Sequence, residues 1–143
     1  MFRLEGARRG DLEAIRWLLD VEFLPSADID EDALAHFLVC RDEIGVAGAV
    51  GLEVYGEVAL LRSLVVTEKH LGCGLGRRLV AGVEELATEM DVRAIYLLTT
   101  TAESFFEYLG YKRVARDSVP EAIRSTREFA SLCPVTAVVM VKS

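Results

Sequence analysis

The sequence predicts an α/β protein in which a mixed central sheet is flanked by helices. Four apolar runs rich in valine and leucine have the length and composition of strands: 46–55, 58–67, 94–100 and 136–142. Helical periodicity at 76–90 separates two of these runs, so a crossover helix is expected to join strands of one sheet. At 143 residues the chain can bury one core, and we expect residues 1–143 to form a single domain.

The N-terminal part is expected to place two helices between strands. A short strand at 2–6 precedes a helix at 11–20, whose apolar face Trp17 extends. A shorter helix at 28–37 then leads into a strand at 37–41. The two helices and the apolar link Phe23-Leu24 between them either form a lid, or the link serves only for packing.

The C-terminal part continues the alternation of helices and strands. A helix at 102–109 ends at Gly110, and a strand at 111–115 follows. Residues 120–132 have the spacing of one more helix or of a structured loop. Internal repeats and low-complexity segments are absent from the sequence.

The hairpin between 46–55 and 58–67 brings charged side chains to one face of the sheet. Gly56 at the first central position suits a two-residue type II′ turn. In that register Glu53, Tyr55 and Arg62 emerge on the same side. The small residues at 47, 49 and 51 are expected to leave open space beside them.

A glycine-punctuated turn lies between the strand at 58–67 and the helix at 76–90. Gly72, Gly74 and Gly76 have no Cβ, so their backbone can approach an anion closely, and the helix adds the positive end of its dipole. The spacing matches neither an NTPase P-loop nor a dinucleotide-binding turn. We therefore expect a phosphate-bearing cofactor, with a plain tight turn and helix cap as the alternative.

Composition restricts the class of protein and of partner. With 52% hydrophobic and 27% charged residues, the sequence is typical of a globular protein, and we expect a cytoplasmic location with no membrane partner. The net charge of −7 argues against a nucleic-acid partner. Cys40, Cys73 and Cys133 are too scattered for a zinc site or a disulfide framework, so we expect reduced thiols and no metal.

Two motifs resemble the GCN5-related N-acetyltransferases. Leu-Gly-Cys-Gly-Leu-Gly at 71–76 is similar to the pyrophosphate loop Arg/Gln-x-x-Gly-x-Gly/Ala of that superfamily. The segment at 99–111, with Ala102, Leu109 and Gly110, is similar to its Asn-x-x-Ala-x-x-x-Tyr-x-x-Leu-Gly-Phe segment. Further matches near 120–134 resemble the small arsenic-resistance N-acetyltransferases and amino-acid N-acetyltransferases.

The resemblance implies acetyl-CoA as the acetyl donor. It implies that the strand residues Leu64, Val65 and Val66 pair with the pantetheine arm, and that an N–H at Leu64 polarises the thioester carbonyl. Thr99 and Phe106 would also contact the cofactor. The pyrophosphate would be bound by a continuous stretch of the chain: Leu71, Gly72, Cys73, Gly74, Leu75, Gly76 and Arg77.

The sequence departs from the superfamily pattern at three positions. Leu71 replaces the usual Arg or Gln, Arg62 replaces a glutamate general base, and Phe106 replaces the tyrosine that reprotonates the thiolate. Glu53 is our candidate base, because it shares a face with Arg62; alternatively, the two residues form only a cross-strand ion pair.

The amine pocket is expected from both the face of the hairpin and the resemblance. Arg62 is suited to pairing with a substrate carboxylate through its planar fork, which favours an acidic, amino-acid-like amine. The complete set of expected substrate residues is Tyr55, Arg62, Thr100, Thr126 and Phe129.

The function that these features favour is acetyl transfer to the primary amine of a small, amino-acid-like molecule, with an arsenic-containing amino acid among the candidates. Two alternatives stay open: a non-catalytic acetyl-CoA-binding module, and an N-acetyltransferase for proteins or peptides. A homodimer formed through the final strands is also possible.

Overall fold

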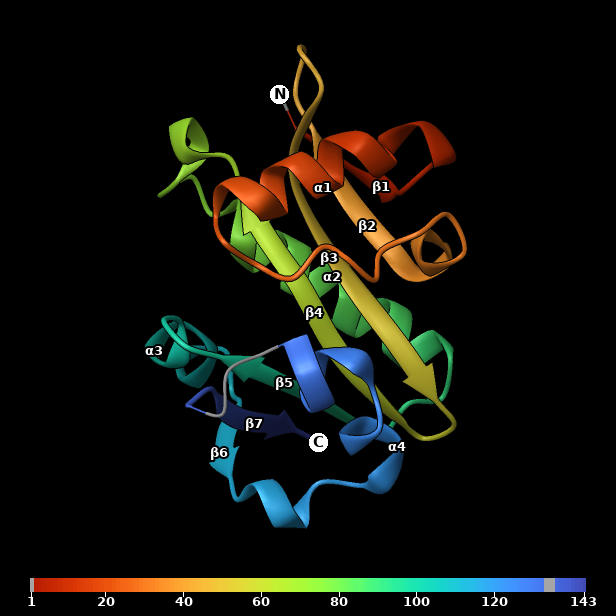
Figure 1. Ribbon diagram of the computed structural model, residues 1–143. Helices are drawn as coiled ribbons and strands as arrows, with labels where there is room; N and C mark the ends of the chain where they lie inside the picture. The colour runs from red at the N-terminus through yellow and green to blue at the C-terminus, as the bar shows by residue number, and fades with distance from the viewer. Residues whose placement is uncertain (1, 133–135) are drawn as a thin grey trace. The chain divides into compact units, whose positions relative to one another are not determined.

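The computed structural model describes residues 2–132 and 136–143, and its strands form one seven-stranded mixed sheet in the order β1-β2-β3-β4-β5-β7-β6 (Figure 1). The mixed α/β class predicted from the sequence is confirmed. The strands are β1 (Arg3–Gly6), β2 (Phe37–Arg41), β3 (Val46–Tyr55), β4 (Val58–Val66), β5 (Ala94–Thr99), β6 (Lys112–Val114) and β7 (Val138–Lys142).

The main helices alternate with these strands along the chain. They are α1 (Leu12–Val21), α2 (Leu75–Glu89), α3 (Glu103–Tyr108) and α4 (Glu121–Arg124). Short 3₁₀ turns and one π-helical turn connect them: Arg9–Asp11, Ala33–His36, Glu68–His70, Arg116–Ser118 and Glu128–Leu132. Pairing is antiparallel between β1 and β2, β2 and β3, β5 and β7, and β6 and β7, and parallel between β4 and β5.

The chain contains two compact units. The first consists of the residues up to Glu53 together with Leu61–Leu86, and the second of Val54–Leu60 together with Ala87–Ser143. The first unit therefore contains β1, β2, α1, the turn between β4 and α2, and α2 as far as Leu86.

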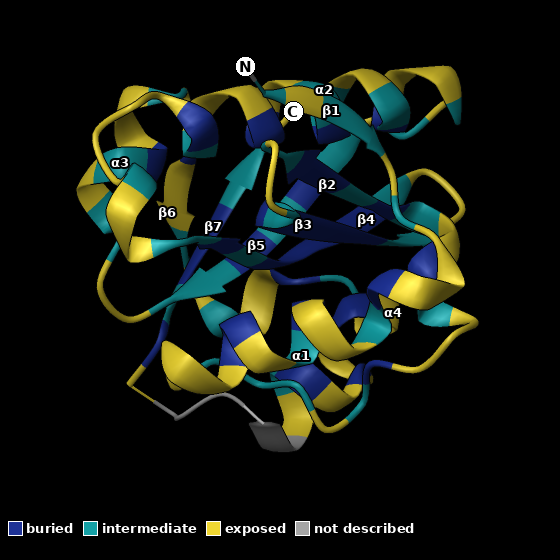
Figure 2. Cartoon of the chain, turned by 90° about the horizontal axis from the view of Figure 1, so that it is seen from above, coloured by how far each residue is buried: buried dark blue, intermediate teal, exposed yellow. Residues whose placement is uncertain are grey.

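In the first unit, α1 and α2 cover opposite faces of the sheet, and the strands between them are buried (Figure 2). On the α1 face, Ile15 and Leu19 pack with Phe37, Val39 and Val65 in one apolar cluster. On the α2 face, Gly82 permits close contact, because a Cβ there would lie 2.8 Å from a Leu4 methyl and 3.0 Å from a Leu38 methyl. Alternating strand residues thus supply the two apolar layers.

Three N-terminal expectations are wrong. The segment expected to be helical at 28–37 contains only the 3₁₀ turn Ala33–His36, because its acidic stretch forms turns before β2. Trp17 is 65% exposed and does not extend the buried face of α1. The small residues of β3 leave no open space, because Ala47 and Ala49 are buried and a Cβ at Gly51 would lie 2.3 Å from Phe37 Cζ.

The second unit packs around β5 and β7. Leu60, Val119, Ile123 and Val139 form its buried apolar cluster. Gly110 ends α3 with φ of +100°, which is the C-cap conformation that a glycine provides without Cβ strain. The segment at 120–132 divides into α4 and the π-helical turn. Cys133 and Pro134, which belong to the resemblance, lie outside the described residues.

Candidate functional site

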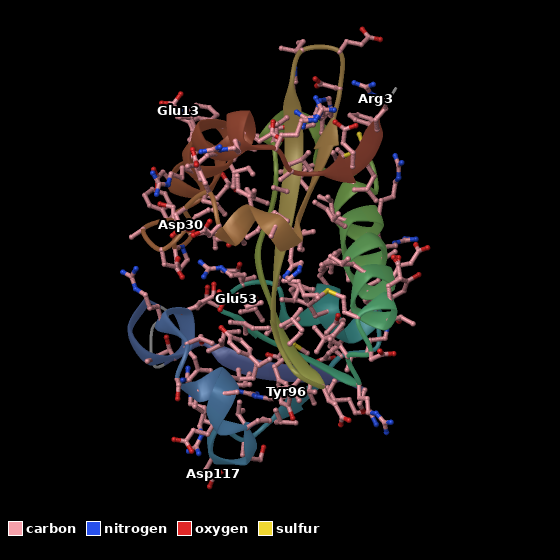
Figure 3. All side chains as sticks on the ribbon, turned by 90° about the vertical axis from the view of Figure 1, so that its right-hand side faces the viewer. Arg3, Glu13, Asp30, Glu53, Tyr96 and Asp117 are labelled. Carbon is pink, nitrogen blue, oxygen red and sulfur yellow. The ribbon has the colours of Figure 1, made fainter. Side chains whose placement is uncertain are left out.

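Arg62 of β4 is the centre of a buried charge cluster in the first unit. Its Nη1 donates to Glu53 Oε2 of β3 at 2.8 Å, and its Nη2 donates to Asp28 Oδ1 at 2.7 Å. Arg62 Nη1 also donates to Asp28 Oδ2, and Nε donates to Ser63 Oγ at 2.9 Å. The cross-strand ion pair between Glu53 and Arg62 is therefore confirmed. Figure 3 labels Glu53 on β3.

Accessibility distinguishes the three charged side chains. Arg62 is 2% exposed and Asp28 is 9% exposed, whereas 27% of the Glu53 side chain is accessible. Glu53 is thus the member of this cluster that a molecule in solution reaches most easily. The role of Glu53 as a general base stays a prediction.

Asp28 is the member of the cluster that sequence reasoning missed. It lies 34 residues before Arg62, in the segment between α1 and the 3₁₀ turn at Ala33–His36. Asp28 and Arg62 are too far apart in the sequence to belong to one local motif. The one available signal was the aspartate's position beside Ile29, which is completely buried and fixes this segment on the core.

β4 carries a local distortion directly after Arg62. Ser63 has φ of +61°, in the left-handed region that is uncommon for a residue other than glycine. The distortion breaks the alternation of side chains, because Arg62 and Val65 both lie on the α1 face although they are three residues apart. The left-handed residue changes the direction of the backbone that follows, which belongs to Leu64 and Val66.

The glycine turn follows β4 and ends at α2. Gly72 and Gly74 have φ of +85° and +80°, and a Cβ added at either glycine would meet no atom within 4 Å. Two of the six loop amides are used inside the chain: Leu71 N–H donates to Glu68 O at 3.2 Å, and Cys73 N–H donates to His70 O at 3.3 Å. These two amides are therefore already hydrogen-bonded within the turn, and the binding of a pyrophosphate by this stretch stays a prediction.

The remaining features of the turn suit an anion. The first amides of α2, from Leu75 to Arg77, belong to the helical turn that has no intrahelical acceptor. Leu75 is 1% exposed, so its side chain anchors the helix start in the core, while Leu71 is 63% exposed. Just before the turn, the Thr67 hydroxyl is buried without a hydrogen-bond partner among the described residues. An open, glycine-rich helix start and an unpaired polar atom fit a phosphate-bearing ligand.

His70 connects the turn to the β2–β3 hairpin, a link that the sequence did not indicate. Its Nε2 lies 2.9 Å from Asp42 Oδ2, and the Phe2 ring packs edge-on against the imidazole at 4.9 Å. The Gly45 N–H, the His70 side chain and the Ile44 N–H hold the pKa of Asp42 well below its usual range. This carboxylate therefore fixes the base of the glycine turn.

The second unit contains the predicted cofactor residues of β5 and α3. Thr99 Oγ1 accepts the Ala102 N–H at 2.9 Å, so this hydroxyl already orders the start of α3. Phe106 is 5% exposed and packs edge-to-face against Tyr111 at 5.5 Å between ring centroids. Tyr108 is 76% exposed. The contacts of Thr99 and Phe106 with a cofactor stay predictions.

The predicted substrate residues outside the charge cluster lie in different environments. Thr126 is 6% exposed, and its hydroxyl donates to Ile123 O at 2.7 Å and accepts from Phe129 N. The Phe129 ring lies 5.2 Å from the Arg116 guanidinium carbon. Tyr55, at the end of β3, is 38% exposed, and Thr100 is exposed after β5. The Thr126 hydroxyl is therefore used in hydrogen bonds to the backbone of its own turn.

Several other groups bear on the class of site. Within the described part of the chain, no group of three or more histidine, cysteine or acidic side chains is arranged to hold a metal ion. Cys40 is a buried free thiol and Cys73 an exposed one, whereas Cys133 lies outside the described residues. None of the described helices is both long and apolar enough to cross a membrane.

The fold and the glycine turn define an α/β protein in which β4, with a left-handed residue at Ser63, leads through a glycine-rich turn into a helix. The acetyltransferase (GNAT) domain family matches residues 33–113, which is more than half of the chain. The chain belongs to this family. The superfamily resemblance seen in the sequence is therefore confirmed.

One relative and two solved structures illustrate what this chain is similar to in sequence and in fold. An uncharacterised N-acetyltransferase of Chlorobaculum tepidum is 33% identical over 97 residues, which cover 65% of this chain and 62% of that protein. N-acetylglutamate synthase from Neisseria gonorrhoeae, solved with coenzyme A and N-acetyl-glutamate, superposes with a TM-score of 0.86 at 19% identity. That match covers 99% of this chain but only 35% of the synthase. A GNAT-family acetyltransferase from Staphylococcus aureus has a TM-score of 0.76 at 16% identity, with 99% and 98% of the two chains covered.

Proposed function

We propose that this protein transfers the acetyl group of acetyl-CoA to the primary amine of a small, amino-acid-like molecule. The observation that carries the proposal is the partly exposed Glu53 carboxylate held on Arg62, in a chain that belongs to the acetyltransferase domain family. An amine must lose a proton as it forms the new bond, and a carboxylate accepts that proton directly or through water. Support for an amino-acid-like acceptor comes from the fold likeness to N-acetylglutamate synthase and from the resemblance in sequence.

The donor site in this proposal is the backbone of β4 and of the glycine turn. Acetyl-CoA supplies an activated thioester, whose carbonyl carbon forms a bond to the amine nitrogen as the carbon–sulfur bond breaks. The amides of Gly72, Gly74 and the first turn of α2 bind the pyrophosphate, with Arg77 beside them. The Leu64 N–H, which follows the left-handed residue Ser63, polarises the carbonyl. Solvent protonates the thiolate, because position 106 holds a phenylalanine.

We also propose that the residues predicted from the sequence to surround the acceptor do so. Tyr55 alternates with Glu53 along β3, so the two side chains leave the same face of that strand. Thr100 and Phe129 are the partly or fully exposed candidates of the second unit, and Thr126 supports Phe129 through its hydroxyl. A cytoplasmic location and a homodimer formed through the final strands also stay predictions.

Mass-spectrometric detection of acetylated product tests the proposal. Purified protein is incubated with acetyl-CoA and a panel of amino acids, their carboxamides, arsenic- and phosphorus-containing analogues, and short peptides. We expect turnover of at least one small amine, and a fall in kcat of roughly 10²–10⁴ in Glu53→Gln. Glu57→Gln is the matched control, because Glu57 is an exposed glutamate in the turn after β3 and its side chain is 72% exposed.

Two other outcomes would replace the proposal. Binding of acetyl-CoA, measured by calorimetry, without turnover of any amine would establish a non-catalytic binding module. Turnover of peptides but of no free amine would establish a protein or peptide N-acetyltransferase. An unchanged kcat in Glu53→Gln would exclude this carboxylate as the proton acceptor.

A further inference from the structure

We propose, on the basis of the acetyl transfer proposed above, that Asp28 is a positioning residue for Glu53. By occupying the Arg62 guanidinium, Asp28 holds Glu53 at its edge and closes Arg62 to a substrate carboxylate. The acceptor is then bound through its ammonium group, and a carboxylate on the acceptor is not required.

The hydrogen bonds of Arg62 carry the first step. A guanidinium can bind a planar carboxylate with two parallel N–H bonds, either end-on through both Nη atoms or side-on through Nε and one Nη. Asp28 takes the end-on pair with its two carboxylate oxygens. Ser63 Oγ takes the Nε–H at 2.9 Å. Each parallel pair on Arg62 therefore includes an N–H that the protein already uses.

The charge of the cluster carries the second step. The Arg62 guanidinium meets two carboxylates, those of Asp28 and Glu53. Because Arg62 and Asp28 are nearly buried and 27% of the Glu53 side chain is accessible, the part of the cluster that an acceptor reaches is a carboxylate. A carboxylate attracts an ammonium group and disfavours a second carboxylate. The Glu53 carboxylate therefore favours the amine end of the acceptor.

The attachment of the Asp28 segment carries the third step. Ile29 is completely buried in the apolar cluster that includes Ile15 and Phe37. Its carbonyl accepts a hydrogen bond from the Arg16 guanidinium, and its N–H donates to Ser26 O at 3.1 Å. Asp28 is thus held by a fixed backbone. A carboxylate on such a support sets the position of the guanidinium, and through it the position of Glu53.

The test compares amino acids with their carboxamides as acceptors, using wild type, Asp28→Asn and Asp30→Asn. Asp30 is the matched control, since it lies on the same segment, is exposed, and accepts the Ala33 N–H at 2.9 Å, a bond that asparagine can keep (Figure 3). We expect wild type to acetylate each carboxamide at least as efficiently as its amino acid. Asp28→Asn should lower kcat by about 10–100-fold with KM changed less than about threefold, because the base is misplaced.

A double variant separates positioning from simple neutralisation. Asp28→Leu combined with Arg62→Met replaces the buried pair by apolar side chains, which folded proteins commonly tolerate. Glu53 then has no guanidinium to hold it, and we expect kcat to stay low. Calorimetric binding of acetyl-CoA within about twofold of wild type would show that every variant is folded.

Three results would overturn the proposal. A wild-type preference of tenfold or more for the amino acids, together with a lower amino-acid KM in Asp28→Asn, would show that Arg62 binds the substrate carboxylate. Full activity in the double variant would show that Asp28 only neutralises Arg62. Wild type that acetylates no amine would remove the proposed function itself, and with it this role of Asp28, before any variant is compared.

Discussion

Replacing Gly51 by alanine should destabilise the fold through one identifiable clash. The new Cβ would lie 2.3, 2.4 and 2.8 Å from three carbons of the Phe37 ring, whereas ordinary contacts of this kind are 3.4–4 Å. The ring would therefore have to move by about 1 Å, and Phe37 is only 2% exposed within the α1-side cluster. Such overpacking costs about 1–3 kcal/mol.

The net effect is smaller than the clash alone. Alanine in a strand gains roughly 0.5–1 kcal/mol over glycine, because glycine loses more conformational freedom on folding. We expect Gly51→Ala to lower the free energy of unfolding by about 1–2 kcal/mol. With an m-value of about 2 kcal/mol/M in urea, the midpoint should fall by roughly 0.5–1 M.

Urea unfolding followed by circular dichroism measures this change. The matched control is Gly6→Ala in β1, where a Cβ would meet nothing within 4 Å, and its midpoint should be equal to or above that of wild type. In the double variant Gly51→Ala with Phe37→Leu, the smaller side chain should relieve the clash, with a favourable coupling of about 1 kcal/mol or more. A Gly51→Ala midpoint equal to that of wild type, or additive effects in the double variant, would refute the reasoning.

Three further predictions concern the glycine turn. Leu71→Arg should tighten acetyl-CoA binding by about threefold to thirtyfold at low salt, because the exposed side chain at this position would then pair with a phosphate. The gain in affinity should shrink as salt is added. Calorimetry at two salt concentrations measures both effects, and an affinity equal to that of wild type would contradict the prediction. Gly74→Ala should cost about 1–2 kcal/mol of stability, because its φ of +80° strains a residue with a Cβ; an unchanged thermal midpoint would exclude that strain. Asp42→Asn should be less stable than wild type at pH 7, and the difference should shrink below about pH 4. Folding lowers the pKa of Asp42, so the stabilisation by its carboxylate is present above the unfolded pKa and is lost as pH falls toward the folded pKa. Urea unfolding of both proteins at pH 7 and pH 3 measures this change, and a stability difference that is the same at both pH values would contradict the prediction.

The sequence by itself determined the features that depend on local chemistry. Strand patterns in 46–55 and 58–67 predicted β3 and β4 to within one residue, because the alternation of side chains is a local property. Gly56 and Gly110 have positive φ where a turn and a helix end were expected. The glycines of the turn before α2 were likewise sufficient to predict a strand, turn and helix, and the family membership agrees with that motif.

The tertiary structure decided which distant groups meet. The ion pair of Glu53 and Arg62 followed from the predicted hairpin, but Asp28 joins it from 34 residues away through the path of an irregular segment. The left-handed backbone at Ser63 has no sequence signal, since serine is an ordinary strand residue and its strain is maintained by the surrounding packing. Phe37 fills the space over Gly51 because the register of β2 on β3 places them opposite each other. Long-range packing and charge pairing therefore set the details of the candidate site, which local patterns do not encode.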